Sequence, residues 1–430
     1  MIPKHQREEI ISLVHREVVP AIGCTEPVAV ALGVARATEL LGKVPEELNL
    51  SLSGNIIKNA MGVGIPGTGM IGLPVAVALG ALIGRSEYAL EVLRDVNPES
   101  VEQAKAYMKE GRINIKVAEN APSNLYIDVT AVADGHTSHA VISEAHTNFV
   151  LLERDGEVLE DRRQPAETSS TSSTHDDDIT LSLAMVYEFA TETPLEEIEF
   201  ILEARDLNKS AAMLALSQDY GHSLGSTINR CGKHLFGDTP VEHIISYTSA
   251  ACDARMGGAP IPVMSNSGSG NQGITATMPV VSYAEDIQAS DEQLARALML
   301  SHLTSIYIKQ SLGRLSALCG CVVASTGASS GLVYLMGGGY EQVVAAVKNM
   351  IANLTGMICD GAKPSCSMKI SSGVSTALMS AMLAMNGRCV TSAEGIVAED
   401  VDQTIHNLTS IGREAMLETD RLVLKIMTCK

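Results

Sequence analysis

Four of the nine cysteines lie between Gly313 and Lys369. They are Cys319, Cys321, Cys359 and Cys366, and the last two form a Cys-x6-Cys pair in the turn-rich segment CDGAKPSC. Thiolates gathered around one point can bind a metal ion or an iron–sulfur cluster. Zinc sites and ferredoxin-type clusters usually show shorter spacings, and free cysteines are often small core residues. The spacing alone leaves a metal site and a set of buried core thiols as alternatives.

A further thiol, Cys24, stands just before a predicted helix. Pro27 suits the first turn of this Ala- and Val-rich helix, which runs to about Leu41. The amide dipoles at a helix N-terminus lower the pKa of a thiol, so Cys24 is a candidate thiolate or cluster ligand. Glu26 is close enough in sequence to act at the same site. The alternative is a capped, buried thiol in an ordinary turn.

Two segments rich in glycine and polar residues are candidates for binding a small substrate. The first, GNIIKNAMGVGIPGTG, follows a short predicted strand at 49–53 and matches neither the phosphate loop nor the dinucleotide fingerprint. The second is the loop predicted within PIPVMSNSGSGNQGITATMPV, whose glycines allow a ligand to approach closely. The candidate binding residues are Asn55, Lys58, Asn59, Ser265, Asn266, Ser267, Ser269, Asn271 and Gln272. A packed turn and an ordinary long loop are the alternatives.

Taken together, these motifs resemble those of one family. The segments GCTEPVAVAL, SLSGNIIKNAMGVGIPGT, SNSGSGNQGI, SALCGCVVA and MICDGAKPSC occur in the order that the single-chain iron–sulfur L-cysteine desulfidases show. That family is related to the alpha chains of iron–sulfur L-serine dehydratases. The resemblance implies a 4Fe-4S cluster bound by Cys319, Cys359 and Cys366, with Cys321 as the rival of Cys319 for the third position. It also implies that Cys24 is either the base or a fourth ligand.

The reaction implied by the resemblance is β-elimination of L-cysteine to pyruvate, ammonia and hydrogen sulfide. A cluster with three cysteine ligands leaves one iron free to act as a Lewis acid, and Cys24 and Glu26 would be the catalytic residues. One alternative is an L-serine dehydratase that forms pyruvate and ammonia. Another is a pyridoxal phosphate lyase using Lys363, Lys309 or Lys58, in which the grouped cysteines would have no purpose. The third is an amino-acid-binding protein without catalysis.

Composition restricts the partners and the location. The net charge of −19 argues against nucleic acid and anionic membranes as partners. The N-terminal residues lack the pattern of a secretion signal, and an odd number of cysteines fits a reducing compartment. We therefore expect a cytoplasmic protein that binds a small amino acid. The Ala-rich helices are compatible with a homo-oligomer.

The chain divides into two predicted domains, because 430 residues are too many for one ordinary core. Residues 4–19 and the apolar stretch 70–83 each predict a helix, the second buried and too short for a membrane span. Residues 114–159 predict an antiparallel meander of about four strands. A polar linker at 162–178 precedes repeated apolar helical stripes. The expected fold is α+β, with an N-terminal α/β domain at 1–165 and a mostly helical, serine-dehydratase-alpha-like domain at 179–430 that carries the cluster cysteines.

Overall fold

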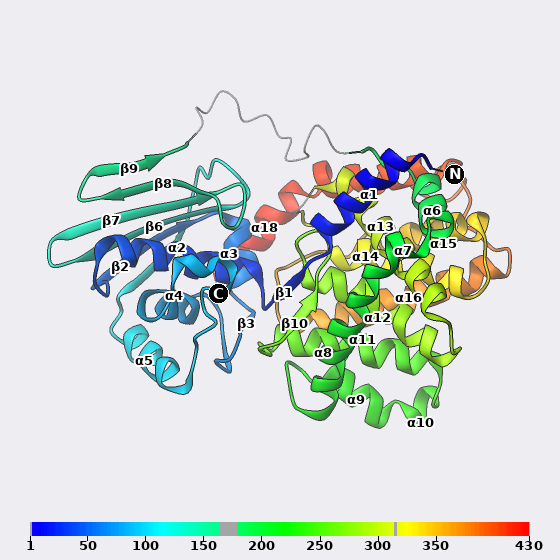
Figure 1. Ribbon diagram of the computed structural model, residues 1–430, viewed down its shortest axis with the longest axis horizontal. Helices are drawn as coiled ribbons and strands as arrows, with labels where there is room; N and C mark the ends of the chain where they lie inside the picture. Colours follow the sequence, from blue (N-terminus) through cyan, green and yellow to red (C-terminus); the bar gives the residue numbers. More distant parts are fainter. Residues whose placement is uncertain (1, 164–178, 314–315, 430) are drawn as a thin grey trace.

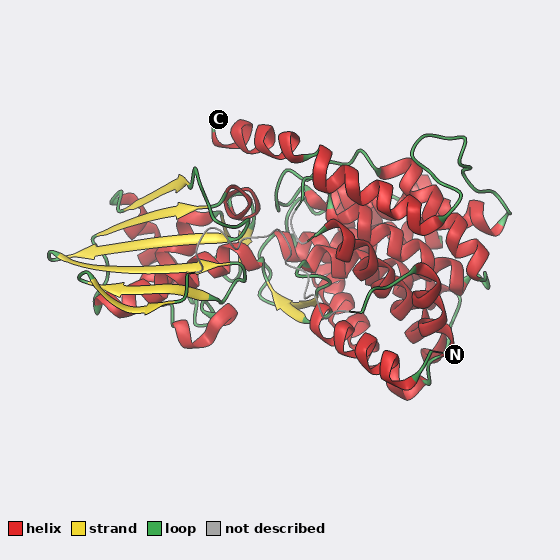
Figure 2. Cartoon of the chain, turned by 90° about the horizontal axis from the view of Figure 1, so that it is seen from above, coloured by secondary structure: helices red, strands yellow, loops and turns green. Residues whose placement is uncertain are grey.

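The structure is a computed structural model that describes residues 2–163, 179–313 and 316–429. It consists of an α/β part and a larger helical part that lie side by side (Figures 1 and 2). The α+β fold class and the helical character of the C-terminal half are confirmed. Most of the predicted linker, from residue 164 on, lies outside the described residues.

The α/β part is built around one mixed sheet with the strand order β5-β2-β6-β7-β8-β9. Its strands are β2 (Glu47–Leu52), β5 (Ile113–Val117), β6 (Tyr126–Ala133), β7 (His136–Ser143), β8 (Phe149–Arg154) and β9 (Glu157–Asp161). Its helices are α2 (Thr25–Leu41), α3 (Gly54–Ala60), α4 (Leu73–Leu82) and α5 (Pro98–Lys109), and it also contains the short strands β3 (Gly64–Ile65) and β4 (Met70–Ile71) and the 3-10 helix η1 (Ser86–Glu91).

The predicted meander differs from the observed sheet in one respect. Strand β2 lies between β5 and β6, pairing parallel with β5 and antiparallel with β6. A parallel neighbour requires a long crossover, and here α3, α4 and α5 provide it. The segment 114–159, expected to form about four consecutive strands, therefore contains five, β5 to β9. Its first strand, β5, pairs with β2, which lies before this segment. The helix predicted at 70–83 is α4, preceded by the two residues of β4.

The helical part contains the helices α1 (Lys4–Glu17), α6 (Leu183–Glu192), α7 (Leu195–Ile198), η3 (Glu199–Leu202), α8 (Glu203–Ser217), α9 (Leu224–Cys231), α10 (Lys233–Phe236), α11 (Pro240–Met256), α12 (Gly270–Asp286), α13 (Asp291–Leu312), α14 (Gly320–Leu335), α15 (Tyr340–Leu354), α16 (Cys366–Met385), α17 (Val401–Ser410), η4 (Ile411–Ala415) and α18 (Leu417–Thr428). The strands β1 (Pro20–Ile22) and β10 (Pro262–Met264) pair beside them. Helix α14 lies at the centre, against α12, α13, α15 and α16.

Small residues let these helices approach closely. A Cβ atom added at Gly327 would lie 2.2 Å from Ser305 Oγ, and one at Gly331 would lie 2.7 Å from the carbonyl oxygen of Ala297. Glycine at both positions of α14 therefore permits its close packing on α13, as the composition predicts. Within the described residues, no helix is both long and apolar enough to cross a membrane.

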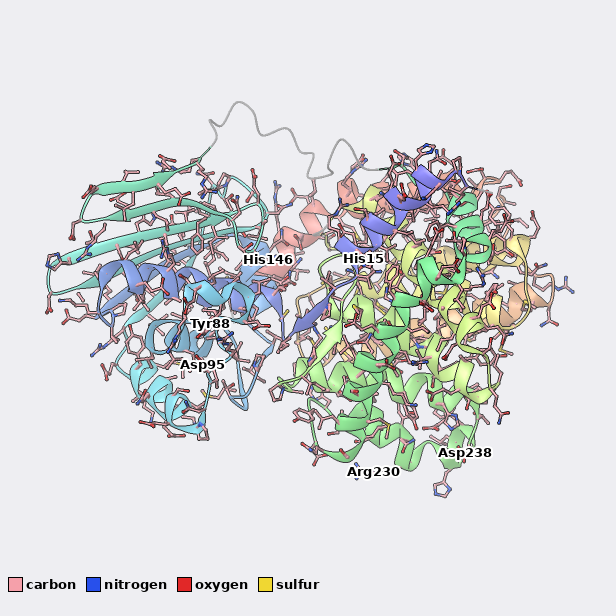
Figure 3. All side chains as sticks on the ribbon, in the orientation of Figure 1. His15, Tyr88, Asp95, His146, Arg230 and Asp238 are labelled. Carbon is pink, nitrogen blue, oxygen red and sulfur yellow. The ribbon has the colours of Figure 1, made fainter. Side chains whose placement is uncertain are left out.

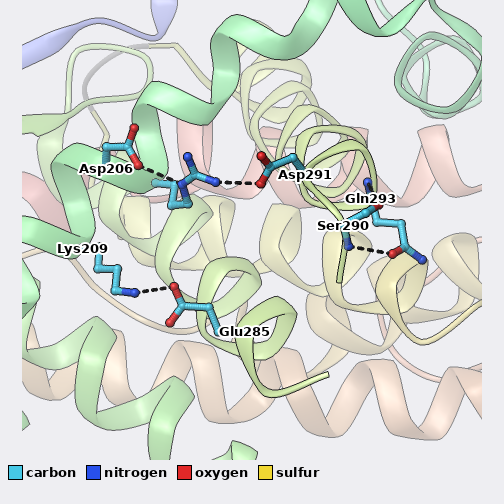
Figure 4. A network of polar contacts seen from close by, with 7 residues as sticks. Asp206, Lys209, Glu285, Ser290, Asp291 and Gln293 are labelled. Carbon is cyan, nitrogen blue, oxygen red and sulfur yellow. Dashed lines mark hydrogen bonds and ion pairs between the residues drawn. The ribbon is translucent and has the colours of Figure 1, made fainter. Parts of the chain in front are cut away.

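Polar contacts on the outer surface connect α8, α12 and α13 (Figure 4). Arg205 Nη1 lies 2.9 Å from Asp291 Oδ1, and Lys209 Nζ lies 2.6 Å from Glu285 Oε1. Ser290 caps the first turn of α13. Exposed ion pairs of this kind usually contribute about 0–1 kcal/mol each, so the buried contacts mainly set the positions of these helices.

Both ends of the chain pack far from their sequence neighbours. Helix α1 buries Ile10, Leu13 and Val14 in the core of the helical part. At the other end, α18 extends to the α/β part, where Leu424 lies against Gly54 of α3 (Figure 1). These contacts cross the boundary expected from the sequence, and the division into domains 1–165 and 179–430 stays a prediction.

Candidate active site

The cysteines of the C-terminal motifs lie at the start of two helices. Cys319 immediately precedes α14, and Cys366 is the first residue of α16. Leu318 and Ile358 form an isolated antiparallel bridge, and backbone hydrogen bonds on both sides extend it. This short pairing brings the CDGAKPSC loop to the CGC turn and places Cys359 beside Cys319.

The thiols of Cys319 and Cys359 form a hydrogen-bonded pair of unequal acidity. The hydrogen bond with Cys319 lowers the pKa of Cys359 to about 6, against the effect of burial and with help from the nearby Lys58 and Lys369. The same hydrogen bond, together with burial, raises the pKa of Cys319. Burial also raises the pKa of Cys366. The site therefore favours one thiolate before any cation is bound.

Cys321 makes different contacts from Cys319. Its Sγ donates a hydrogen bond to the carbonyl oxygen of Lys369 at 3.2 Å. A Cβ atom added at Gly373 of α16 would lie 2.5 Å from this sulfur. Burial raises the pKa of Cys321 to about 12. Cys321 is thus packed between α14 and α16 as a neutral thiol.

The sulfur positions suit a cluster better than a single ion. No three cysteine sulfurs of the described residues lie within 4.8 Å of one another. One ion requires its ligand atoms to converge, whereas an iron–sulfur cluster distributes its thiolates over several irons. The soft donor set and its thiolate-favouring charges fit such a cluster.

The first polar segment of the α/β part meets the cysteine loop. A Cβ added at Gly361 would lie 2.0 Å from the carbonyl oxygen of Lys58, so the two chain segments are in direct contact. Lys58 is 2% exposed and pairs with Asp420 of α18. The side-chain oxygen of Asn55 is buried and has no hydrogen-bond partner among the described residues.

Cys24 precedes α2, as the sequence predicts, but its acidity differs from the prediction. Its Sγ lies 3.1 Å from Glu26 Oε2 and 4.0 Å from the carbonyl oxygen of Asn59. Burial and the charge of Glu26 raise the pKa of Cys24 well above its ordinary value, although Arg255 acts in the opposite direction. The expected lowering by the helix dipole is therefore wrong, because burial and the neighbouring carboxylate outweigh it.

The second polar segment forms an internal network. Ser265 Oγ donates to the carbonyl oxygen of Val19 at 2.6 Å, and Asn266 Nδ2 donates to the carbonyl oxygen of His302 at 3.2 Å. Ser267 Oγ donates to Asn266 Oδ1 at 2.9 Å. These three predicted binding residues hold the segment against β1 and α13.

The segment is also shorter than the loop expected from sequence. Ser269 caps α12, its Oγ accepting from the backbone N–H of Gln272 at 3.4 Å, so Asn271 and Gln272 lie in the helix. A Cβ added at Gly320 would lie 2.9 Å from Gln272, which places this side chain against the CGC turn. The Oε1 atom of Gln272 is buried without a hydrogen-bond partner in the described structure.

Arg255, which the sequence analysis missed, connects these segments. It lies near the end of α11, is 5% exposed, and donates from Nη2 to the carbonyl oxygen of Gly23 at 3.0 Å and from Nη1 to Asn271 Oδ1 at 3.1 Å. Its Nε has no hydrogen-bond partner among the residues described. The sequence did contain a signal for Arg255. In SAACDARMGGA, Asp253 and Arg255 interrupt a run of small residues of the kind that is usually buried.

A surface depression of about 640 Å³ lies elsewhere. It is bordered by side chains of the α/β part, including Arg36, Glu39, Arg85 and Arg162. None of the candidate residues borders it. We place the site at the cysteines, because buried groups with altered pKa values and missing partners gather there.

Two comparisons with known proteins identify the family. A model of the serine dehydratase alpha chain matches residues 87–425. The chain is 61% identical to a UPF0597 protein of Phocaeicola vulgatus over 432 residues, covering 100% of this chain and 99% of the relative. It is 49% identical to a UPF0597 protein of Oleidesulfovibrio alaskensis, covering 99% of each, and 46% identical to one of Aeromonas hydrophila, covering 99% of this chain and 97% of the relative.

The matched range contains the SNSGSGNQGI, SALCGCVVA and MICDGAKPSC motifs, and the relatives extend the similarity over the segments with Cys24 and Lys58. This agrees with the resemblance to serine dehydratases noted in the sequence, and it makes a lyase-type activity the general expectation. The chain belongs to the serine dehydratase alpha chain family.

Proposed function

We propose that the protein is an iron–sulfur-dependent lyase that eliminates hydrogen sulfide from L-cysteine. The observation that carries the proposal is the backbone pairing of Leu318 with Ile358, which sets Cys359 beside Cys319 in a buried position near Lys58. Cys24 lies next to this region, because its Sγ is 4.0 Å from the carbonyl oxygen of Asn59, the residue after Lys58. Glu26 and Arg255 lie beside Cys24. Family membership supports the reaction type, and the choice of cysteine as substrate follows from the resemblance to single-chain desulfidases.

In this proposal Cys319, Cys359 and Cys366 hold a 4Fe-4S cluster. The contacts favour Cys319 over Cys321, because Cys319 pairs with Cys359 whereas Cys321 donates to a carbonyl oxygen between two helices. When bound, the cluster supplies a Lewis-acidic iron that polarises the substrate. Lys58 and Lys369 offset the negative charge that the thiolates bring into the buried site.

The remaining residues bind and orient the amino acid. Arg255 supplies positive charge for the substrate carboxylate, and the unpartnered oxygens of Asn55 and Gln272 can accept hydrogen bonds from its ammonium group. Asn271 orients Arg255 through the 3.1 Å contact. Lys58 and Asn59 keep the first segment against the cysteine loop and Cys24. Ser265, Asn266, Ser267 and Ser269 position the second segment.

Cys24 and Glu26 handle the Cα proton. Because its pKa is raised, Cys24 holds its proton at Sγ, 3.1 Å from the Glu26 carboxylate that can accept it. The thiolate left after transfer is stabilised by Arg255 and can take the Cα proton. The Cα–H and Cβ–S bonds break, and the bonding electrons of Cα–H form the double bond. The Cβ–S electrons leave with the sulfur as hydrosulfide, which takes the proton held by Glu26 to give hydrogen sulfide. The released aminoacrylate tautomerises to an imine, which water hydrolyses to pyruvate and ammonia.

The same geometry can accept L-serine, and the family model of the serine dehydratase alpha chain favours that second candidate. Hydroxide would then replace sulfide as the group that leaves Cβ. All nine cysteines are free thiols, which supports our further proposal that the protein works in the reducing cytoplasm.

The test is turnover by protein purified and reconstituted without oxygen, with iron content measured on the same sample. We expect sulfide and pyruvate in equal amounts from L-cysteine. Activity on L-serine alone would replace the substrate and keep the mechanism. Iron-loaded protein without turnover of either amino acid would contradict the lyase proposal and favour an amino-acid-binding protein, which calorimetry with L-cysteine would detect.

A further inference from the structure

A second group of metal-ligand side chains lies at the far end of α11. Asp238 precedes this helix, and Glu242 and His243 are in its first turn. One ligand atom from each lies within 4.8 Å of the other two, and this is the only such group among the residues that the structure describes. Figure 3 labels Asp238 at the lower edge of the helical part. Along the helix, at about 1.5 Å per residue, Glu242 lies about 15 Å from Cys252.

Glu242 makes this group more than an acidic cluster. Its side chain is 0% exposed, and neither carboxylate oxygen has a hydrogen-bond partner within the described residues. His243 Nε2 lies 3.6 Å from Glu242 Oε2. A buried carboxylate without hydrogen bonds is unfavourable, and buried charges are ordinarily paired or bound to metals. The Glu242 carboxylate therefore offers ligand atoms to a site that a cation would complete.

His243 is already oriented as a metal ligand. Its Nδ1 lies 2.7 Å from Asp286 Oδ1, at the last residue of α12, and its Nε2 lies 2.8 Å from Asp238 Oδ1. A carboxylate on one ring nitrogen fixes the imidazole so that the other nitrogen can bind a metal. The edge of the Tyr247 ring, with ring centroids 6.2 Å apart, also restricts the imidazole.

The spacing and charge fit a divalent ion. In a tetrahedral zinc site with bonds of about 2.0–2.1 Å, ligand atoms lie about 3.3 Å apart, and the distances from His243 Nε2 to Asp238 and Glu242 are 2.8 and 3.6 Å. Even with a protonated His243, the carboxylates of Asp238, Glu242 and Asp286 leave an excess of negative charge. A mixture of oxygen and imidazole nitrogen is typical of zinc and similar transition metals rather than magnesium or calcium.

We propose that Asp238, Glu242 and His243 bind a zinc ion, with Asp286 as the partner that orients His243 and water in the open position next to the exposed Asp238. The site joins the start of α11 to the end of α12. The opposite ends of these two helices carry Arg255 and Asn271, which are in contact at 3.1 Å. The ion therefore holds in place the pair of helices that presents Arg255 to the cysteine site.

The experiment uses full-length protein without an affinity tag, purified without oxygen, treated with a chelator and titrated with Zn²⁺. Zinc and iron are measured on each sample, together with the melting temperature. We expect one zinc per chain and a rise of a few degrees in the melting temperature. Glu242→Gln keeps the side-chain volume and should weaken zinc binding by more than about tenfold and abolish the rise, without changing the iron content.

Two further variants make the result decisive. Asp238→Asn changes an exposed residue, so folding is not at risk, and it should also weaken zinc binding. Glu285→Gln removes a neighbouring surface carboxylate that pairs with Lys209 and should bind zinc as the wild type does. The proposal is overturned if the wild type binds no zinc, if Glu242→Gln and Asp238→Asn bind it normally, or if Glu285→Gln loses it equally.

Discussion

The two ends of α11 differ in the donors that surround them. The end with Cys252 and Arg255 faces a region of thiols, and Cys252 is close enough to Cys366 for its charge to affect the Cys252 pKa. The end with Glu242 and His243 gathers carboxylates and an imidazole. Soft thiolates select iron–sulfur clusters, whereas oxygen and nitrogen donors select zinc-like ions. The length of α11 would thus keep the two proposed cofactors, which differ in chemistry, apart.

Replacing a proposed cluster thiol should distinguish the two ends of α11 most clearly. Cys359→Ser and Cys366→Ser should abolish both iron binding and turnover, because serine does not replace a thiolate on iron, and should leave zinc binding at the far end unchanged. The measurements are iron and zinc content and the release of sulfide and pyruvate. Cys231→Ser, at an exposed cysteine outside the motifs, is the control. A fully active Cys359→Ser variant would refute the assignment of the cluster.

The neighbouring cysteines of the CGC turn should behave differently from each other. Cys319→Ser should lose iron as Cys359→Ser does, whereas Cys321→Ser should retain most of it, because Cys321 donates to a carbonyl oxygen between helices. Iron content and the visible spectrum of reconstituted protein measure the effect. The reverse result, iron lost only in Cys321→Ser, would exchange the two assignments.

At the Arg255 end, loss of the guanidinium should impair turnover while iron stays bound. Hydrogen bonds to charged groups contribute about 1.5–3 kcal/mol, so Arg255→Gln should lower kcat/KM for L-cysteine by about 10- to 100-fold. Steady-state kinetics at unchanged iron content is the measurement. Arg205→Gln, at a surface ion pair, serves as the control. Normal kinetics in Arg255→Gln would show that Arg255 does not bind the substrate.

The buried His302 of α13 should give a small pH dependence of stability. Burial lowers the pKa of His302 from its ordinary 6.5 to about 3, and its ring lies 3.0 Å from Thr277 Oγ1 of α12. Between these values the unfolded chain takes up the proton more readily than the folded chain, so acid lowers the free energy of unfolding. The contribution is complete above about pH 6.5 and is lost as the pH falls towards about 3.

The variant His302→Gln should lack this contribution. We expect the difference in unfolding free energy between wild type and variant to shrink as the pH falls from about 7 to about 5. Urea denaturation at several pH values measures it, and comparing the two proteins cancels the acid sensitivity of other groups. A difference that does not vary with pH would show that the pKa of His302 is the same in the folded and unfolded chains, so that burial does not lower it.

Local signals in the sequence predicted much of this architecture. Pro27 and the small residues after it defined α2, which ends at Leu41 as expected. The apolar stripe of α1 predicted a helix, but a stripe does not say which core buries it, and Ile10 and Val14 pack in the helical part. The place of β2 in the sheet likewise depends on a pairing between distant segments, which alternation of side chains cannot specify.

The candidate site was predictable to the extent that its residues lie in recognisable motifs. Arg255 was missed because its function depends on contacts with Gly23 and Asn271, which come from two other segments. The expected acidity of Cys24 was wrong because sequence shows the helix end but not the depth of burial. Burial and charge from distant residues are the quantities that the fold adds.

The contact between α18 and the α/β part can form only late in synthesis. Lys58, beside Cys359, pairs with Asp420, which lies 362 residues further along the chain. The ribosome adds Asp420 362 residues after Lys58, so the α/β part emerges long before this partner of Lys58 exists. The cysteine region therefore acquires the Lys58–Asp420 pair only after α18 has left the ribosome. The proposed cluster would accordingly find its complete surroundings only in a chain that already includes α18.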